Sequence, residues 1–224
     1  MSLQILQKKD LPLGGFAGLK EHRLIVDKKI GGSDNSWNGI GNFVYLADAQ
    51  FMPNGETGLH SHKEIDVISV MIDGRIIHEG SLEHGKSMMA NQAQAQRAGS
   101  EGFQHNEINP DNSENRMLQL WALPEKLGGS AQYKFYNLEN DKLTTIYGGE
   151  KNQETTLDNH TIIETGLLGK GKNIIRDRGF IAYVVKGGGS LNNTHVVEGD
   201  LVRGENLNFL SEYNDTMLVV VTIE

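Results

Sequence analysis

The chain has 224 residues, a formal net charge of -8 at neutral pH and no cysteine. The lack of cysteine excludes disulfides, thiolate ligands and thiol nucleophiles, so any metal must be held by nitrogen and oxygen. The negative charge argues against nucleic-acid binding, and no apolar run approaches the roughly 18 residues of a membrane span. The amino-terminal segment lacks the apolar core of a secretory signal. We therefore expect a cytoplasmic protein.

Short apolar or alternating segments recur along the chain and read as strands. In chain order they cover residues 43–47, 67–72, 117–121, 133–136, 181–185 and 217–223. Clusters of Gly, Asn and Asp separate them, and the 27 glycines exceed the roughly 16 expected at average usage. Because these residues favour tight turns, the pattern predicts an all-β sandwich or barrel.

An internal repeat is visible at low identity. Residues 70–74 resemble residues 183–187, which places Gly74 and Gly187 at an offset of 187 - 74 = 113. The next pair of turns, Gly85 and Gly199, has an offset of 199 - 85 = 114, whereas Met117 and Met217 in the last strands differ by 100. The second half is thus 114 - 100 = 14 residues shorter before its last strand. We predict two domains, residues 1–138 and 139–224. The alternative is one large sandwich in which the turns are merely similar in sequence.

Two short segments could bind a metal. His60-Ser61-His62 and His105-Asn106-Glu107 each place two donor side chains two residues apart, which on a strand puts both on one face. If the two segments lie on neighbouring strands, four nitrogen and oxygen donors converge. Such a set suits Fe(II) best and also Mn, Ni, Cu or Zn.

The surroundings of these donors resemble the two cupin motifs, G-x5-H-x-H-x3,4-E-x6-G and P-x-G-x2-H-x3-N. Gly102, His105 and Asn109 fit the second motif fully. Asp66 stands where the first motif has Glu, and Ser100 replaces the proline of the second. The resemblance implies jelly-roll β-barrels of the cupin kind, here two in tandem.

A closer resemblance is to the pirin family, which has a P-H-P-H segment, a downstream H-x-E segment and an L-Q-L-W strand. Here these read Leu59-His60-Ser61-His62, His105-Asn106-Glu107 and Leu118-Gln119-Leu120-Trp121. Both prolines are missing, and Lys63 follows where Arg is usual. The resemblance implies a metal site of His60, His62, His105 and Glu107. It also implies quercetin 2,3-dioxygenase-type activity, with Glu107 as ligand and base.

The repeat also yields an expectation for the second domain. Adding 113 to the positions of His60, His62 and Asp66 gives Asn173, Ile175 and Gly179, which are not a ligand set. The missing fourteen residues remove the counterpart of the segment that carries His105. We expect residues 139–224 to be a degenerate, metal-free cupin.

Three functions remain open. The first is an oxygenase that acts on a small molecule, namely a flavonol or another phenolic or enediol compound. The second is a non-catalytic metal-responsive or redox-responsive regulator that binds a protein partner. The third, a metal-dependent isomerase or sugar-modifying cupin, has the least support, because the sequence does not gather the basic and aromatic groups that such sites use.

The other histidines carry weaker expectations. His78 and His84 flank an apparent hairpin, so we expect them to be solvated turn residues. The isolated His22, His160 and His195 are read as surface or satisfied core residues.

Overall fold

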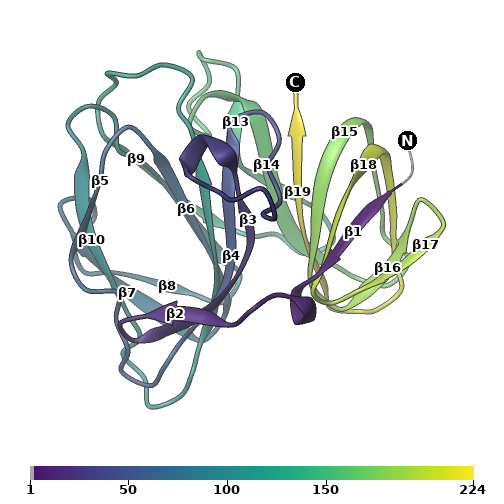
Figure 1. Ribbon diagram of the computed structural model, residues 1–224, viewed down its shortest axis with the longest axis horizontal. Helices are drawn as coiled ribbons and strands as arrows, with labels where there is room; N and C mark the ends of the chain where they lie inside the picture. The colour runs from purple at the N-terminus through teal and green to yellow at the C-terminus, as the bar shows by residue number, and fades with distance from the viewer. Residues whose placement is uncertain (1–2) are drawn as a thin grey trace. The chain divides into compact units, whose positions relative to one another are not determined.

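The computed structural model describes residues 3–224 and is built almost entirely of β-strands (Figure 1). The chain divides into two compact units. The first is Pro12–Asn137; the second combines the chain up to Leu11 with Leu138–Glu224. Within residues 3–224, no helix is long and apolar enough to cross a membrane. The all-β prediction is confirmed.

The first unit contains eleven strands in two sheets and one short 3-10 helix, η2 (Lys28–Ile30). The strands are β2 (Gly14–Phe16), β3 (Leu19–Val26), β4 (Phe43–Phe51), β5 (His60–His62), β6 (Asp66–Asp73), β7 (Arg75–Gly80), β8 (Lys86–Met89), β9 (Gln92–Arg97), β10 (Phe103–Ile108), β11 (Arg116–Ala122) and β12 (Gln132–Asn137). The larger sheet has the order β12-β9-β6-β11-β4-β3-β2, and the smaller has the order β5-β10-β7-β8.

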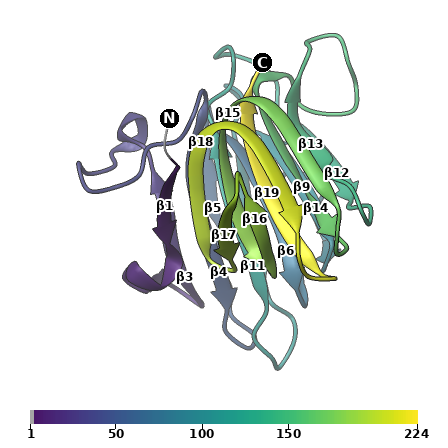
Figure 2. The same cartoon turned by 90° about the vertical axis from the view of Figure 1, so that its right-hand side faces the viewer.

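The second unit has a single eight-stranded sheet and the 3-10 helix η1 (Lys8–Asp10). Its strands are β1 (Gln4–Gln7), β13 (Thr144–Gly149), β14 (Asn159–Leu168), β15 (Asn173–Lys186), β16 (Gly188–Leu191), β17 (Thr194–Val197), β18 (Asp200–Ser211) and β19 (Thr216–Ile223). Figure 2 shows β18, β15 and β19 curving together. Phe180, Val202, Phe209 and Leu218 belong to its apolar core.

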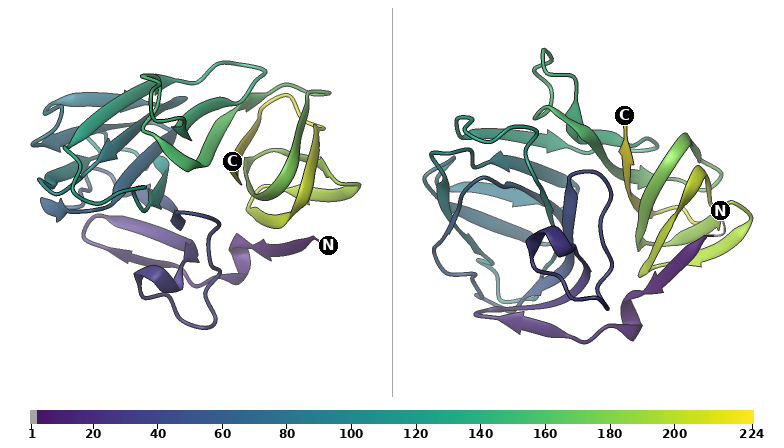
Figure 3. Two further views of the ribbon diagram at one scale, coloured as in Figure 1. Left: turned by 90° about the horizontal axis from the view of Figure 1, so that it is seen from above. Right: turned by 45° about the horizontal axis from the view of Figure 1, so that its top comes forward.

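The predicted first domain, residues 1–138, includes strand β1, but the structure places this strand in the second unit. Strand β1 pairs antiparallel with β18, from Gln4 opposite Arg203 to Gln7 opposite Asp200 (Figures 1 and 3). The partners of its backbone hydrogen bonds therefore lie in the second unit, and residues 3–11 belong to that unit. A sequence boundary cannot reveal such a pairing, because the two strands lie almost 200 positions apart.

The inner face of the larger sheet of the first unit carries a polar row between two apolar layers. Gln119 on β11 lies opposite Ser69 on β6, and Ser69 lies opposite Gln94 on β9. On one side of this row, Met117 and Met71 join an apolar cluster. On the other side, Val67 and Trp121 pack with Phe103. Because alternate strand residues share a face, the row faces the interior of the barrel.

Asp66 occupies the other face of β6. It is fully buried, and it accepts hydrogen bonds from Arg97 Nε at 3.1 Å and Nη2 at 3.0 Å. The two residues are also direct partners in the β6–β9 ladder. Asp66 therefore joins β6 to β9 through a buried ion pair.

We expect Asp66→Ala to lower the free energy of unfolding by about 3–5 kcal/mol, because it leaves the Arg97 charge buried without its carboxylate. Urea denaturation followed by circular dichroism measures the change. Asp34→Ala is the control, because Asp34 is 93% exposed in its pair with Lys28 and should show no measurable effect. Equal effects of the two substitutions would contradict the assignment.

Candidate metal centre

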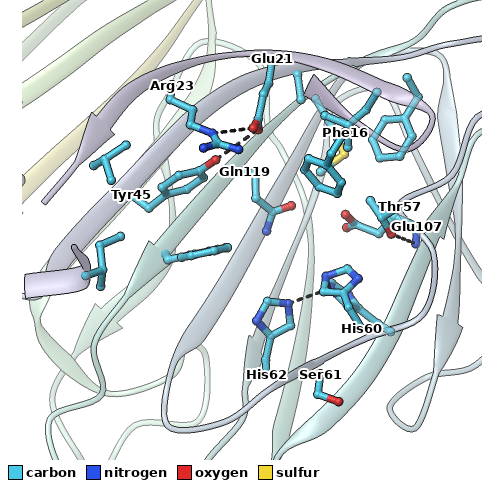
Figure 4. A pocket seen from close by; sticks show the side chains of 18 residues that line it. Phe16, Glu21, Arg23, Tyr45, Thr57, His60, Ser61, His62, Glu107 and Gln119 are labelled. Atoms are coloured by element: carbon cyan, nitrogen blue, oxygen red, sulfur yellow. Dashed lines mark hydrogen bonds and ion pairs between the residues drawn. The ribbon is translucent and has the colours of Figure 1, made fainter. Parts of the chain in front are cut away.

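Three histidine side chains converge from two neighbouring strands of the smaller sheet. Strands β5 and β10 are antiparallel, with His105 opposite His60 and Phe103 opposite His62. The Nε2 atom of His105 lies 3.0 Å from that of His60 and 3.1 Å from that of His62. Figure 4 shows His60 and His62 side by side on the pocket wall. The predicted juxtaposition of the two segments is thus present for the histidines.

The protonation of these rings leaves lone pairs available for a metal. Gly58 O lies 2.9 Å from His60 Nδ1, which places the proton on Nδ1 and leaves Nε2 as an acceptor. Burial, with a smaller effect of His60, lowers the pKa of His62 to about 4. Burial also holds the pKa of His105 far below its usual value. Both rings are therefore neutral at neutral pH, which is the form that binds metals.

The spacing of the three nitrogens fits a transition metal. The donor atoms of His60, His62 and His105 all lie within 4.8 Å of one another. Two ligand nitrogens at right angles, each about 2.1 Å from an ion, are about 3.0 Å apart. The two measured separations of 3.0 and 3.1 Å match this value. These side chains can hold one ion on one face of its coordination sphere.

Glu107 lies in the same pocket but outside this close group. Its carboxylate Oε1 accepts a hydrogen bond of 2.9 Å from Ser69 Oγ, and its backbone N–H donates to Thr57 Oγ1. Burial raises the pKa of Glu107 to about 7, and the bond from Ser69 partly offsets this effect. Its role as the fourth ligand stays a prediction.

His78 corrects one expectation. It lies within β7, opposite Glu107 on β10, and is 1% exposed. Its ring centroid is 5.4 Å from that of His105, and its Nε2 lies 3.2 Å from Gln96 Nε2. The prediction of a solvated turn residue was wrong, because β7 extends to Gly80 and the turn begins only after it. His84, by contrast, is exposed in the turn.

A cavity of about 500 Å³ opens beside the histidines, within the usual range of small-molecule sites. Tyr45 and Trp121 form one aromatic wall, with ring centroids 4.4 Å apart and planes at 23°. The aliphatic and aromatic lining consists of Phe16, Leu19, Val26, Ile30, Ala49, Phe51 and Met117. This pocket suits a flat, largely apolar ligand.

Polar residues that the sequence analysis did not single out also line the cavity. Gln119 lies between the histidine end and the end formed by Glu21 and Arg23 (Figure 4). Its Oε1 accepts from Ser69 Oγ at 3.4 Å, whereas its Nε2 is buried without a hydrogen-bond partner. A buried amide donor without a partner is costly. It therefore offers a hydrogen bond to a ligand oxygen. The signal available in the sequence was a Gln inside an otherwise apolar strand.

Comparison with known proteins finds a match to a family model over part of the chain. Residues 29–122 match the family model described as Pirin. The quercetin 2,3-dioxygenase of Escherichia coli K12 is 30% identical over 78 residues, which are 34% of this chain and 33% of that protein. A pirin-like protein of Caulobacter vibrioides is 26% identical over 122 residues, covering 47% of this chain and 52% of that protein. The first curated relatives are thus matched over about a third of their length.

The fold extends over the whole chain. The crystal structure of the Escherichia coli pirin YhhW in complex with nickel(II) superposes with a TM-score of 0.83 at 16% identity, covering 99% of both chains. A structure of YhhW from the same organism gives the same TM-score and covers 97% of that protein. Residues 29–122 therefore match the Pirin family model, and the chain as a whole has the two-cupin fold of the bacterial pirin structure.

Proposed function

We propose that this protein is a mononuclear metal-dependent dioxygenase of the quercetin 2,3-dioxygenase type. Its substrate would be a flavonol or another electron-rich phenolic or enediol compound. The observation that carries the proposal is the set of three Nε2 atoms, 3.0 and 3.1 Å apart, beside a cavity with an aromatic wall. The names of its relatives support the same activity. We expect it to act in the cytoplasm.

His60, His62 and His105 would hold the metal, with Glu107 as a fourth ligand. Fe(II) is the ion we propose, because a nitrogen and oxygen donor set suits it. When bound, it would supply redox chemistry with dioxygen and a positive charge beside the substrate oxygen.

The protein's own groups would bind the substrate and take its proton. The stacked pair of Tyr45 and Trp121 offers an aromatic surface for a ring, and the Nε2 of Gln119 offers a donor for a ring oxygen. Glu107, a buried carboxylate in the same pocket, would be the base that accepts the proton of a substrate hydroxyl. Ser69 holds this carboxylate through its Oε1.

Oxygen consumption tests the proposal. After anaerobic reconstitution with Fe(II), we expect the protein to consume oxygen when a flavonol is added. His62→Ala should abolish this uptake, and His84→Ala, which changes an exposed histidine outside the pocket, should leave it unchanged. No uptake by the wild type, or equal uptake by His62→Ala, would contradict the proposal. Tight metal binding without turnover would instead favour the non-catalytic regulator.

A further inference from the structure

We propose that Glu21, Arg23 and Tyr45 form a second recognition site in the same cavity, which binds a hydroxyl group at the far end of an aromatic ligand. This inference rests on the proposed function only in taking the histidine end as the reacting end. Figure 4 shows the three side chains gathered at one end of the pocket, with Gln119 between them and the histidines.

The cluster is built by two neighbouring strands. Glu21 and Arg23 are two residues apart on β3 and point to the same face, opposite Ala49 and Ala47 of β4. The small alanine side chains leave room above the sheet at these positions. Tyr45, two residues before Ala47, reaches the cluster along the same face of β4.

Both oxygens of the Glu21 carboxylate have a partner. Oε1 accepts from Arg23 Nε at 2.6 Å, and Oε2 accepts from the Tyr45 hydroxyl at 3.1 Å. Burial and the Glu21 charge raise the pKa of Tyr45 far above its usual value. The phenol therefore stays protonated and keeps donating to Glu21, which fixes the carboxylate in place.

Arg23 differs from the arginine of a closed structural pair. Arg116 holds Asp48 with two nitrogens, Nε at 2.9 Å and Nη2 at 2.7 Å, and its side chain is 12% exposed. Arg23 meets Glu21 through Nε, while its side chain keeps 54% of its surface exposed and lines the cavity. Because a guanidinium carries five N–H donors, Arg23 can donate hydrogen bonds to Glu21 and to a ligand at the same time.

The chemistry of the cluster selects a hydroxyl group. Arg23 offers donors and Glu21 offers an acceptor side by side, and a hydroxyl both donates and accepts. A ligand carboxylate would pair with Arg23 but would also meet the negative charge of Glu21. The aromatic wall of Tyr45 and Trp121 indicates that the hydroxyl belongs to an aromatic ring.

Isothermal titration calorimetry on the Zn(II)-loaded protein tests this assignment, since zinc has no redox chemistry and permits no turnover. The probes are 3-hydroxyflavone and its derivatives with a hydroxyl or a carboxylate on either outer ring. We expect a hydroxyl on the ring that reaches the cluster to raise affinity about tenfold over the parent compound. The matching carboxylate should bind less tightly than the hydroxyl.

Arg23→Met should remove this tenfold gain, so that the hydroxylated probe binds no more tightly than 3-hydroxyflavone. Arg75→Met is the matched control, because Arg75 is paired with Asp111 outside the cavity and should retain every affinity. Equal losses for parent and hydroxylated probes in Arg23→Met would overturn the assignment, as would tighter binding of the carboxylate. Failure of the wild type to bind any probe would overturn it too. Selective binding without oxygen uptake by the Fe(II) protein would reject only the oxygenase proposal.

Discussion

Replacing His62 with alanine is expected to lower the affinity for Ni(II) or Zn(II) by more than about 100-fold. Losing a partner that only orients a ligand costs about 10–100-fold, and His62 would be a ligand itself. Its Nε2 lies 3.1 Å from that of His105, so the substitution leaves two imidazoles where three converge. His105→Ala should have an effect at least as large, because its Nε2 lies within 3.1 Å of the Nε2 atoms of both His60 and His62.

Competition with a chromogenic chelator measures these affinities, and elemental analysis gives the metal content per chain. His84→Ala and His195→Ala are matched controls, since they change histidines on other strands and turns. We expect both controls to bind one ion per chain with wild-type affinity. A His62→Ala variant that keeps full stoichiometry and affinity would show that the three converging rings are not the metal site.

The predicted metal site rested on strand periodicity for the two pairs and on the family resemblance for bringing the pairs together. A period of two placed His60 with His62 and His105 with Glu107, and the structure pairs β5 directly with β10. The sequence could not give the distance from Glu107 to the histidines. That distance depends on the bond from Ser69, which comes from the opposite sheet.

Two strands near the site, β3 and β9, were not predicted from the apolar pattern, because side chains that point inward from them are polar. Strand β9 alternates Gln with Ala, and Gln94 and Gln96 are both buried. Strand β3 points Glu21 and Arg23 into the cavity. A barrel that encloses a ligand site breaks the usual rule of apolar interior positions. The apolar pattern therefore fails at polar interior positions, of which Glu21 and Arg23 line the cavity.

The internal repeat matches equivalent turns at Gly74 and Gly187, but its second match, Gly85 with Gly199, joins turns that are not equivalent. Gly74 and Gly187 have φ values of 74° and 75° and follow β6 and β15. Gly85, however, precedes β8, whereas Gly199 lies between β17 and β18. The position that corresponds to Gly199 is Asn91, between β8 and β9, with a φ of 64°. Asn tolerates this conformation as glycine does, so matching glycines alone misaligned the turn.

The second half is shorter because one of its strands, β18, takes the place of two strands of the first unit. In the first unit β9 pairs with β6, and the separate strand β10 pairs with β7. In the second unit the single strand β18 pairs with both β15 and β16. The first unit thus inserts a loop, residues 98–102, between two strands that are continuous in the second. That the second unit binds no metal stays a prediction.

The metal affinity of the wild-type protein is expected to rise with pH up to about 7 and then level off, if Glu107 is a ligand. The folded-state pKa of Glu107 is raised to about 7 from its usual 4.5, so the metal-free protein holds this proton below pH 7. A ligating carboxylate must release it. Affinity should therefore fall about tenfold for each pH unit below 7. The pKa of His62 is lowered to about 4, so its own competition with protons begins only near that pH.

Calorimetry at pH 6 in buffers of different ionisation enthalpy counts the protons released on binding Zn(II). We expect about one more proton from the wild type than from Glu107→Gln, whose amide cannot ionise yet still accepts the hydrogen bond of Ser69. Glu101→Gln, which changes an exposed carboxylate on the loop before β10, should behave as the wild type. If wild type and Glu107→Gln release equal numbers of protons, Glu107 is not a ligand. The raised pKa would then reflect burial alone, and the metal would be held by the three histidines.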